Sequence, residues 1–215
     1  MAYRFTFAVR GRARFLSHLE TVDTLLSSFR RAGYGIALSR GMKPRPVIAL
    51  ALPRAVGVES EAELADVELT AAADPEQIGS RLASELPEGI SLISIEPAQG
   101  KPAASRVCAV EYLVDVTGDI DWDEALHRYA TAEQAVVTRS APNKAAKRVN
   151  VRSFCSQVER VPTGLAARIE LTEAGTARPE EVATAVAATI GATPTITRLV
   201  RTRIVLREPP VGVST

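Results

Sequence analysis

The chain has 215 residues, of which 46% are hydrophobic and 24% are charged, and its formal net charge is +1. This composition is typical of a globular protein and excludes a disordered tail, a collagen-like chain and a disulfide-rich scaffold. No apolar run reaches the roughly 18–20 residues that a membrane-spanning helix needs. The charged N-terminal stretch lacks the apolar core of a secretory signal. We therefore expect a cytoplasmic protein without membrane contact.

Potential metal ligands are scarce. The chain has two cysteines, Cys108 and Cys155, and two histidines, His18 and His127, in no metal-ligand spacing. A four-ligand zinc site would need all of them, and iron–sulfur clusters require more thiolates than the chain has. We expect neither a metal site nor a cofactor, and interpret both cysteines as small apolar residues on strands.

Charge is segregated along the chain. Residues 1–54 carry 10 basic and 2 acidic side chains, residues 55–133 carry 4 and 17, and residues 134–215 carry 12 and 6. The asymmetry suggests a surface that binds polyanions, built from both ends of the chain. The alternative is that the segments neutralise one another across a domain interface.

The first half predicts alternating strands and helices. Ser17 and Glu20 have the spacing of a capping box, Gly33 suits the C′ position, and Asp74 is a candidate N-cap. In chain order we expect strands at Arg4–Val9 (continued by Arg14–Leu16), Gly35–Ser39, Val47–Leu52, Leu64–Thr70 and Ile90–Ile95, with helices at 18–32 and 75–86. Residues 97–105 have the composition of a linker.

The second half repeats this theme. We expect strands at 107–116, 135–139, 149–154, 166–171 and 196–207, helices from Asp121 to Ala132 and from Pro179 to Gly191, and a frayed tail at Pro209–Thr215. The order predicts an α+β protein of two tandem ferredoxin-like (β-α-β-β-α-β) domains. Their expected bounds are residues 1–98, which include a basic Gly/Pro loop, and 106–208.

The candidate binding site joins the start of the first helix to the Gly/Pro loop. Free N–H groups at a helix N-terminus favour anions, and arginine and lysine bind phosphate. If the first strands are sheet neighbours, one anion-binding pocket would be lined by Arg12, Arg14, His18, Arg40, Lys43 and Arg45. The alternative is a structural histidine among solvated arginines.

Two further charged segments allow more than one interpretation. Val56–Glu63 is expected to be a solvated acidic loop, although clustered carboxylates also bind hard cations or pair with arginines. Ser140–Arg148, with Arg152, is expected to be a basic loop that is either solvated or in contact with phosphates.

Several signatures of known chemistry are missing from the sequence. It contains no phosphate-binding glycine motif of the P-loop or dinucleotide type, no GxSxG and no HExxH. With 5% aromatic residues, recognition of RNA bases by stacking is not favoured.

The run Arg14–Glu20, together with Ser39–Pro46, Val56–Glu63 and Arg178–Val182, resembles the bacterial radical SAM-linked protein family, a domain of unknown function. Members occur fused to, or encoded beside, a radical SAM protein with a cobalamin-binding type domain. This chain departs from the family pattern at Glu20, where Asp is usual. It also departs in the proline loop, where Met42, Lys43 and Arg45 replace an aromatic residue, Asn and His. Without that histidine, an anion-binding role for the loop is favoured over acid–base chemistry.

Two cysteines cannot supply the three-cysteine cluster motif of a radical SAM enzyme, so the resemblance implies an accessory role. We therefore expect a non-catalytic accessory protein that binds RNA or another polyanion, with a radical SAM/cobalamin-type protein as its partner. A second resemblance is to the CRISPR-repeat-processing endoribonucleases, which use tandem ferredoxin-like domains. The alternative function is thus a metal-independent endoribonuclease with His18 as general acid/base, although the glycine-rich loop of those enzymes is absent.

Overall fold

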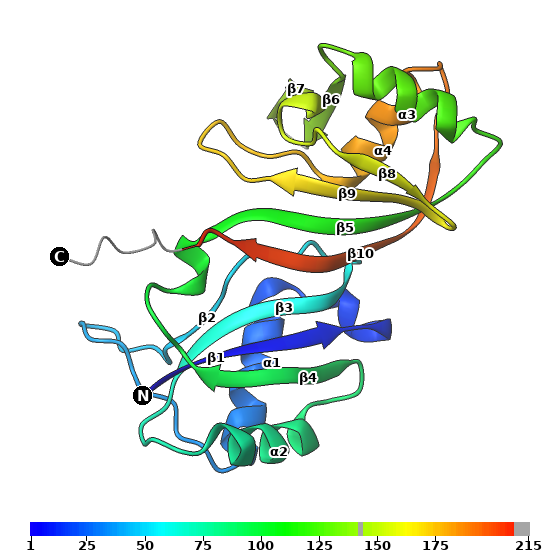
Figure 1. The fold of residues 1–215 in the computed structure, drawn as a ribbon. Helices are drawn as coiled ribbons and strands as arrows, with labels where there is room; N and C mark the ends of the chain where they lie inside the picture. The colour runs from blue at the N-terminus through cyan, green and yellow to red at the C-terminus, as the bar shows by residue number, and fades with distance from the viewer. Residues whose placement is uncertain (142–143, 209–215) are drawn as a thin grey trace. The chain divides into compact units, whose positions relative to one another are not determined.

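A computed structural model describes residues 1–141 and 144–208, which form mixed α+β structure with four α-helices and mostly antiparallel strands (Figure 1). The chain divides into two compact units. Unit 1 comprises Met1–Val107 and the stretch from Leu206 onward, and unit 2 comprises Cys108–Val205. The expected tail Pro209–Thr215 lies outside the described residues. No described helix is both long and apolar enough to cross a membrane.

Unit 1 is an antiparallel sheet packed against two helices. Its elements are β1 (Ala2–Val9), the short 3-10 helix η1 (Gly11–Phe15), α1 (His18–Arg31), β2 (Ile48–Leu50), β3 (Glu59–Glu68), α2 (Pro75–Glu85), β4 (Ile90–Pro97) and the 3-10 helix η2 (Ala103–Ser105). The strand order is β4-β1-β3-β2, and every pairing in it is antiparallel (Figure 1).

The core of unit 1 follows from the period of two along β1. Phe5 and Phe7 point to the same face, and they are buried with Leu25 and Phe29 of α1 and Leu82 of α2. The rings of Phe5 and Phe29 meet edge to face at 5.5 Å between centroids, an arrangement that aromatic rings favour. Both helices therefore cover one face of the sheet.

The helix ends of unit 1 confirm the capping signals. The Ser17 hydroxyl accepts from the Glu20 N–H, and the Glu20 carboxylate accepts from the Ser17 N–H at 2.8 Å. Gly33 follows the helix at φ +86°, in the left-handed region that favours glycine. Asp74 caps α2 by accepting from the N–H of Glu76. These local predictions are confirmed because each depends on residues within one helical turn.

Two strand predictions and one loop prediction in unit 1 were wrong. Residues 14–16 do not continue β1, because η1 replaces the strand there. The segment 35–39 forms isolated bridges at Ile36 and Leu38 instead of a strand. The acidic segment is not a solvated loop, since β3 already begins at Glu59, and both Glu59 and Glu63 are buried.

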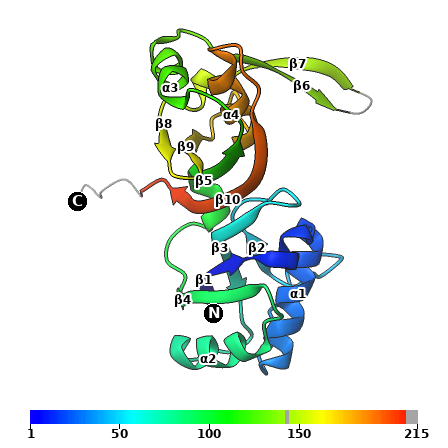
Figure 2. The same ribbon diagram turned by 90° about the vertical axis from the view of Figure 1, so that its right-hand side faces the viewer.

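Unit 2 has a similar sheet and one additional hairpin. Its elements are β5 (Val107–Thr117), α3 (Trp122–Thr131), β6 (Val136–Ala141), β7 (Lys144–Asn150), the 3-10 helix η3 (Val151–Ser153), β8 (Val158–Val161), β9 (Gly164–Glu170), α4 (Pro179–Ala188) and β10 (Thr195–Leu206). The strand order is β10-β5-β9-β8, while β6 and β7 pair with each other as a separate two-stranded sheet. Figure 2 shows this hairpin projecting away from the rest of unit 2.

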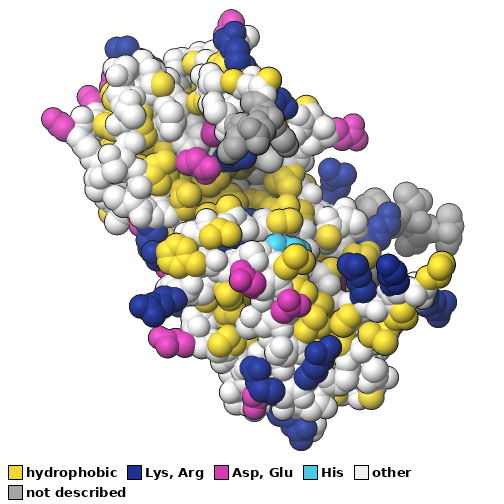
Figure 3. All heavy atoms as spheres, turned by 180° about the vertical axis from the view of Figure 1, so that it is seen from behind, with side chains coloured by type: hydrophobic (Ala, Val, Ile, Leu, Met, Phe, Trp, Pro, Cys, Tyr) yellow, Lys and Arg dark blue, Asp and Glu magenta, His cyan; other side chains and the backbone are white. Residues whose placement is uncertain are grey.

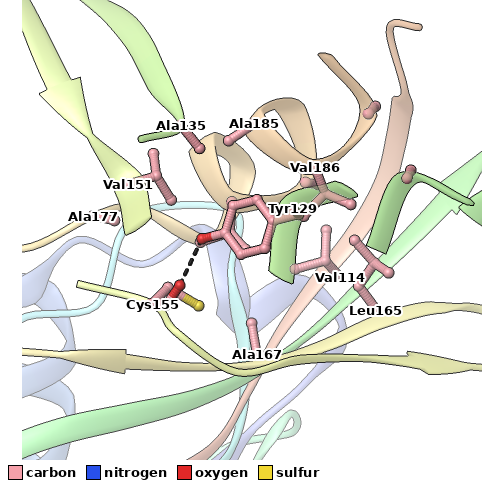
Figure 4. Close-up of a cluster of buried hydrophobic side chains, with 14 of the residues drawn as sticks. Val114, Tyr129, Ala135, Val151, Cys155, Leu165, Ala167, Ala177, Ala185 and Val186 are labelled. Carbon is pink, nitrogen blue, oxygen red and sulfur yellow. Dashed lines mark hydrogen bonds between the residues drawn. The ribbon is translucent and has the colours of Figure 1, made fainter. Parts of the chain in front are cut away.

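The core of unit 2 centres on Tyr129 of α3 (Figure 4). Its ring is buried beside Val114, Leu165 and Val186, and its hydroxyl donates to the carbonyl oxygen of Cys155 at 2.6 Å. A buried hydroxyl that makes such a bond avoids the cost of an unsatisfied polar group. The hydrogen bond ties α3 to the chain that leaves η3.

In unit 2 the predicted basic loop is wrong, because residues 144–150 form strand β7. Asn143 lies outside the described residues. The strand expected at 149–154 ends at Asn150, where η3 begins, and strand β8 was not expected at all. Asp121 caps α3 as expected, by accepting from the N–H of Glu124 at 3.1 Å.

Candidate anion-binding site

The N-terminal half of the expected pocket forms around η1 and the start of α1. The Arg14 guanidinium pairs with the carboxylate of Glu59 at 3.2 Å, and the same carboxylate oxygen accepts from the N–H of Gly11. The guanidinium of Arg14 is therefore engaged by the protein's own acid. The side chain of Arg12 is exposed and makes no ion pair within the described part of the chain.

His18 is the first residue of α1 and is half-buried. Its Nδ1 atom is buried and has no hydrogen-bond partner among the described residues. A catalytic histidine is usually oriented by a hydrogen bond at the ring nitrogen that does not react. The described residues do not supply that bond at Nδ1.

Arg54 organises this region, and sequence reasoning missed it. Its side chain is buried, and its guanidinium donates to the carbonyl oxygens of Arg14, Leu16 and Val58. Several carbonyl acceptors share the buried charge, which burial would otherwise penalise. Nothing in the local sequence around Pro53 and Arg54 signals this role, because the acceptors lie about forty residues earlier or across a turn.

The second half of the expected pocket is the loop Ser39–Arg45, here called the basic loop. It is closed by hydrogen bonds from Ser39 N to Arg45 O at 2.8 Å and from Arg45 N to the Ser39 hydroxyl at 3.1 Å. Arg40, Lys43 and Arg45 are all exposed, and none of them has an ion pair with a described residue. Met42, between them, is fully exposed. The loop thus presents three cations that the described protein does not neutralise.

The two halves do not form one pocket, and the expected juxtaposition is corrected. The bridges of Ile36 with Leu69 and Leu38 with Pro46 place the basic loop at the Glu68 end of β3. Val9, from which the chain continues into η1 and α1, pairs with Ser60 at the other end of β3. At about 3.3 Å per residue, the two ends are roughly 20 Å or more apart along the strand. Figure 1 shows β1 running between these opposite ends of the sheet.

Part of the basic excess is neutralised inside unit 1. Arg4 pairs with Asp66 at 2.7 Å, and Arg31 pairs with Glu85 at 3.0 Å. Together with the pair Arg14–Glu59, these ion pairs join the basic segment 1–54 to the acidic segment 55–133. Mutual neutralisation of these segments was the alternative interpretation of the charge pattern, but it occurs inside unit 1 and not across a domain interface. Figure 3 shows Lys and Arg side chains on one face in separate groups, with some Asp and Glu side chains between them. The basic loop is a local group of three exposed cations.

Residues 2–189 match a bacterial family described as "Uncharacterized protein conserved in bacteria (DUF2344)". The chain belongs to this family. The search of curated proteins found no match.

Two solved structures are similar to this DUF2344 chain at low identity. "Crystal Structure of a Cbf5-Nop10-Gar1 Complex" is 10% identical, with 93% of this chain and 49% of that chain covered, at a TM-score of 0.49. "Crystal Structure of an Unknown Protein from Galdieria sulphuraria" is 14% identical, with 91% and 96% covered, at a TM-score of 0.29. The DUF2344 chain thus spans about half the length of the first structure. Both scores are low, so neither likeness supports a conclusion about function.

A groove along α1 of the DUF2344 chain has a volume of about 640 Å³ and is lined by Arg12, Leu16, Asp23, Arg31 and Glu88, among others. Glu20 also lines it, and hydrogen bonds from the side chain and the N–H of Ser17 hold the pKa of its carboxyl below the ordinary value. The lining thus mixes carboxylates with arginines, which weakens its attraction for anions. No described group of three His, Cys, Asp or Glu side chains is placed to hold a metal ion.

Proposed function

We propose that this protein is a non-catalytic accessory protein that binds RNA or another polyanion, and that Arg40, Lys43 and Arg45 make the decisive contacts. The observation that supports this is the closed, exposed basic loop, whose three cations have no acidic partner among the described residues. Arginine and lysine side chains of this kind bind phosphates through charge-assisted hydrogen bonds. Arg12 and His18 belong to the other end of the sheet and add at most a separate contact.

The proposal includes a radical SAM enzyme as the partner, which rests on the resemblance of Arg14–Glu20 and Ser39–Pro46 to the radical SAM-linked family. It also includes a ferredoxin-like fold for each unit. The strand orders β4-β1-β3-β2 and β10-β5-β9-β8, each with a helix in both crossovers, support that fold.

RNA binding is tested by the salt dependence of the affinity. Binding of a fluorescein-labelled oligouridylate to the full chain is expected to weaken steeply between about 50 and 200 mM salt, because each phosphate contact releases counterions. The double variant Arg40→Glu/Arg45→Glu should abolish binding, while Arg81→Glu, an exposed arginine of α2 with no described ion pair, should not. Salt-insensitive binding, or no binding by the wild type, would reject the proposal.

The same RNA distinguishes the nuclease alternative. If the wild type cleaved it without metal and His18→Ala abolished cleavage but retained binding, the chain would be an endoribonuclease. Intact RNA after incubation with the wild type supports the non-catalytic role. Co-purification of the native protein tests the partner: a radical SAM enzyme in stoichiometric amount is expected, and a lone monomer would contradict the link.

A further inference from the structure

The hairpin of β6 and β7 is a second basic element, and an ion pair helps to hold it to its unit. Arg139 of β6 donates two hydrogen bonds of 2.6 Å to the carboxylate of Glu181 on α4, and a third of 3.1 Å to the carbonyl oxygen of Thr176. A bidentate arginine–carboxylate pair fixes direction as well as distance. The middle of β6 is therefore held against α4, although the hairpin projects from the unit (Figure 2).

The strand register decides which basic side chains of the hairpin are available. Arg139 pairs with Lys147 and therefore points to the same face, while Arg148 pairs with Thr138 and points to the other face. Arg139 is neutralised by Glu181, whereas Lys147 and Arg148 are exposed and have no ion pair with a described residue. The two free cations thus lie on adjacent residues of β7.

A groove of about 360 Å³ lies beside these cations. It is bounded by β7, η3 and the turn Thr172–Thr176, and it is lined mainly by basic residues, hydroxyl residues, an amide residue and glycine: Arg139, Lys147, Arg148, Val149, Asn150, Ser153, Phe154, Thr172, Ala174, Gly175 and Thr176. The hydroxyl of Ser153 is exposed and makes no hydrogen bond within the described residues. The volume is at the lower end of the roughly 300–1,000 Å³ of small-ligand sites, so it accepts a unit of mononucleotide size and not a duplex.

The lining favours a phosphate over a protein partner. Phosphate and sugar oxygens in nucleic-acid complexes are bound by Lys, Arg, Ser, Thr and Asn side chains and by backbone N–H groups. Protein interfaces depend instead on buried aromatic and other large anchors, and here Phe154 is the large apolar residue in the lining, already half-buried in the core of its own unit. Among the described residues that line the groove there is no Asp or Glu, and the nearby carboxylate of Glu181 is engaged by Arg139.

We infer that this groove binds one phosphate-bearing nucleotide unit of a single-stranded RNA, with Lys147, on the face of Arg139, as the contact to its phosphodiester and Arg148, on the other face of β7, as the contact to a neighbouring phosphate. The inference rests on the proposed RNA binding and adds a second contact, in unit 2, to the basic loop of unit 1. It assigns the hairpin the role of a fixed arm that positions two cations beside a polar groove.

The test measures the affinity of the full chain for the labelled oligouridylate across the same salt range. Lys147→Glu and Arg148→Glu should each weaken binding and lower the slope of log affinity against log salt by about 0.7, the value for one phosphate contact on a single strand. The double variant should bind roughly tenfold or more weakly. Lys147→Arg should retain wild-type binding, because it keeps the charge.

Arg81→Glu is the matched control, since Arg81 is an exposed arginine of α2 that has no ion pair with a described residue and does not line the groove. It should leave the slope unchanged, and circular dichroism should show that all variants are folded.

If the hairpin variants bind RNA as the wild type does while Arg40→Glu/Arg45→Glu does not, the inference is wrong and the proposed function stands. If the wild type binds no RNA, both fail. Displacement of the RNA from the wild type by polyglutamate at equal charge would also overturn the inference, because it would show that the surface accepts any polyanion.

Discussion

In the core of unit 2, the buried hydroxyl of Tyr129 donates a hydrogen bond of 2.6 Å to the carbonyl oxygen of Cys155. We predict that Tyr129→Phe lowers the free energy of unfolding by about 1–3 kcal/mol, since it leaves a buried carbonyl without that donor. Urea denaturation measures the change. Tyr34→Phe is the control, because the hydroxyl of half-buried Tyr34 donates to no described acceptor. Equal stability of the two variants would contradict the prediction.

The thiol of Cys155 is predicted to be unreactive in the folded protein. Burial raises its pKa to about 12, so almost no thiolate is present near neutral pH. A thiol-specific reagent should therefore label Cys155 only after urea is added, which mass spectrometry of the labelled peptides would show. The raised pKa favours folding below the ordinary value of 9.0, and this contribution is lost as the pH rises from there toward 12.

Some residue roles cannot be predicted from the sequence because the partner is remote. Glu59 and Glu63 look like members of an acidic loop, yet both are buried on β3, and Glu59 accepts from Arg14 and from Gly11 N. Arg54 looks like a surface arginine and is buried among carbonyl groups. The local charge pattern of the sequence is the same whether such a residue is exposed or buried, so only the folded structure distinguishes the two cases.

At the scale of elements, the pair Arg139–Glu181 joins the hairpin to α4. Burial would raise the pKa of Glu181, but the hydrogen bonds from Arg139 and from the Arg178 N–H outweigh it and lower the pKa below 4.5. The contribution of the pair to stability is therefore fully present above that value and is lost as the pH falls through the lower, folded-state pKa.

We predict that Glu181→Gln destabilises the protein at neutral pH by about 1–3 kcal/mol, because it leaves a partly buried guanidinium without its counter-charge. The difference from the wild type should shrink as the pH is lowered well below 4.5. Thermal unfolding across this pH range would show it. A constant difference at every pH would mean that the ion pair does not carry the effect.

Elements with local signals were predicted well, and strands whose sequence shows no alternation of apolar and polar residues were not. The caps at Ser17, Asp74 and Asp121 are confirmed, since each involves only the next two or three residues. Strand β7 has a basic sequence that reads as a loop, and it is a strand because it pairs with β6. Strand β8 has four residues, too few for a pattern of alternation to appear.

At the scale of the whole molecule, unit 2 is a continuous segment inserted between two parts of unit 1. We predict that residues 108–205 expressed alone fold and unfold cooperatively, because the segment has its own core. Trp122, the single tryptophan of the chain, is buried in that core and reports its unfolding. Its fluorescence should shift to longer wavelength in urea in one transition. A spectrum typical of exposed tryptophan without denaturant would contradict the prediction.

The composition of the candidate site was predictable, but its geometry was not. The sequence identifies Arg40, Lys43 and Arg45 as a cationic loop, and the structure exposes all three. Whether that loop meets the start of α1 depends on which end of β3 it pairs with, and the bridge of Ile36 with Leu69 decides this. The end of β3 with which this segment pairs is determined by the arrangement of the whole sheet, so no local sequence pattern predicts it.

The chain enters and leaves unit 2 at neighbouring points. The Arg207 N–H donates to the carbonyl oxygen of Arg106 at 2.7 Å, and one step further the Cys108 thiol meets the carbonyl oxygen of Val205 at 3.5 Å. Surface segments with adjacent ends are the places where foreign domains are tolerated. Residues 108–205 could therefore be replaced between Arg106 and Arg207 by a short turn or by a reporter domain. With the short turn, unit 1 would become a continuous chain.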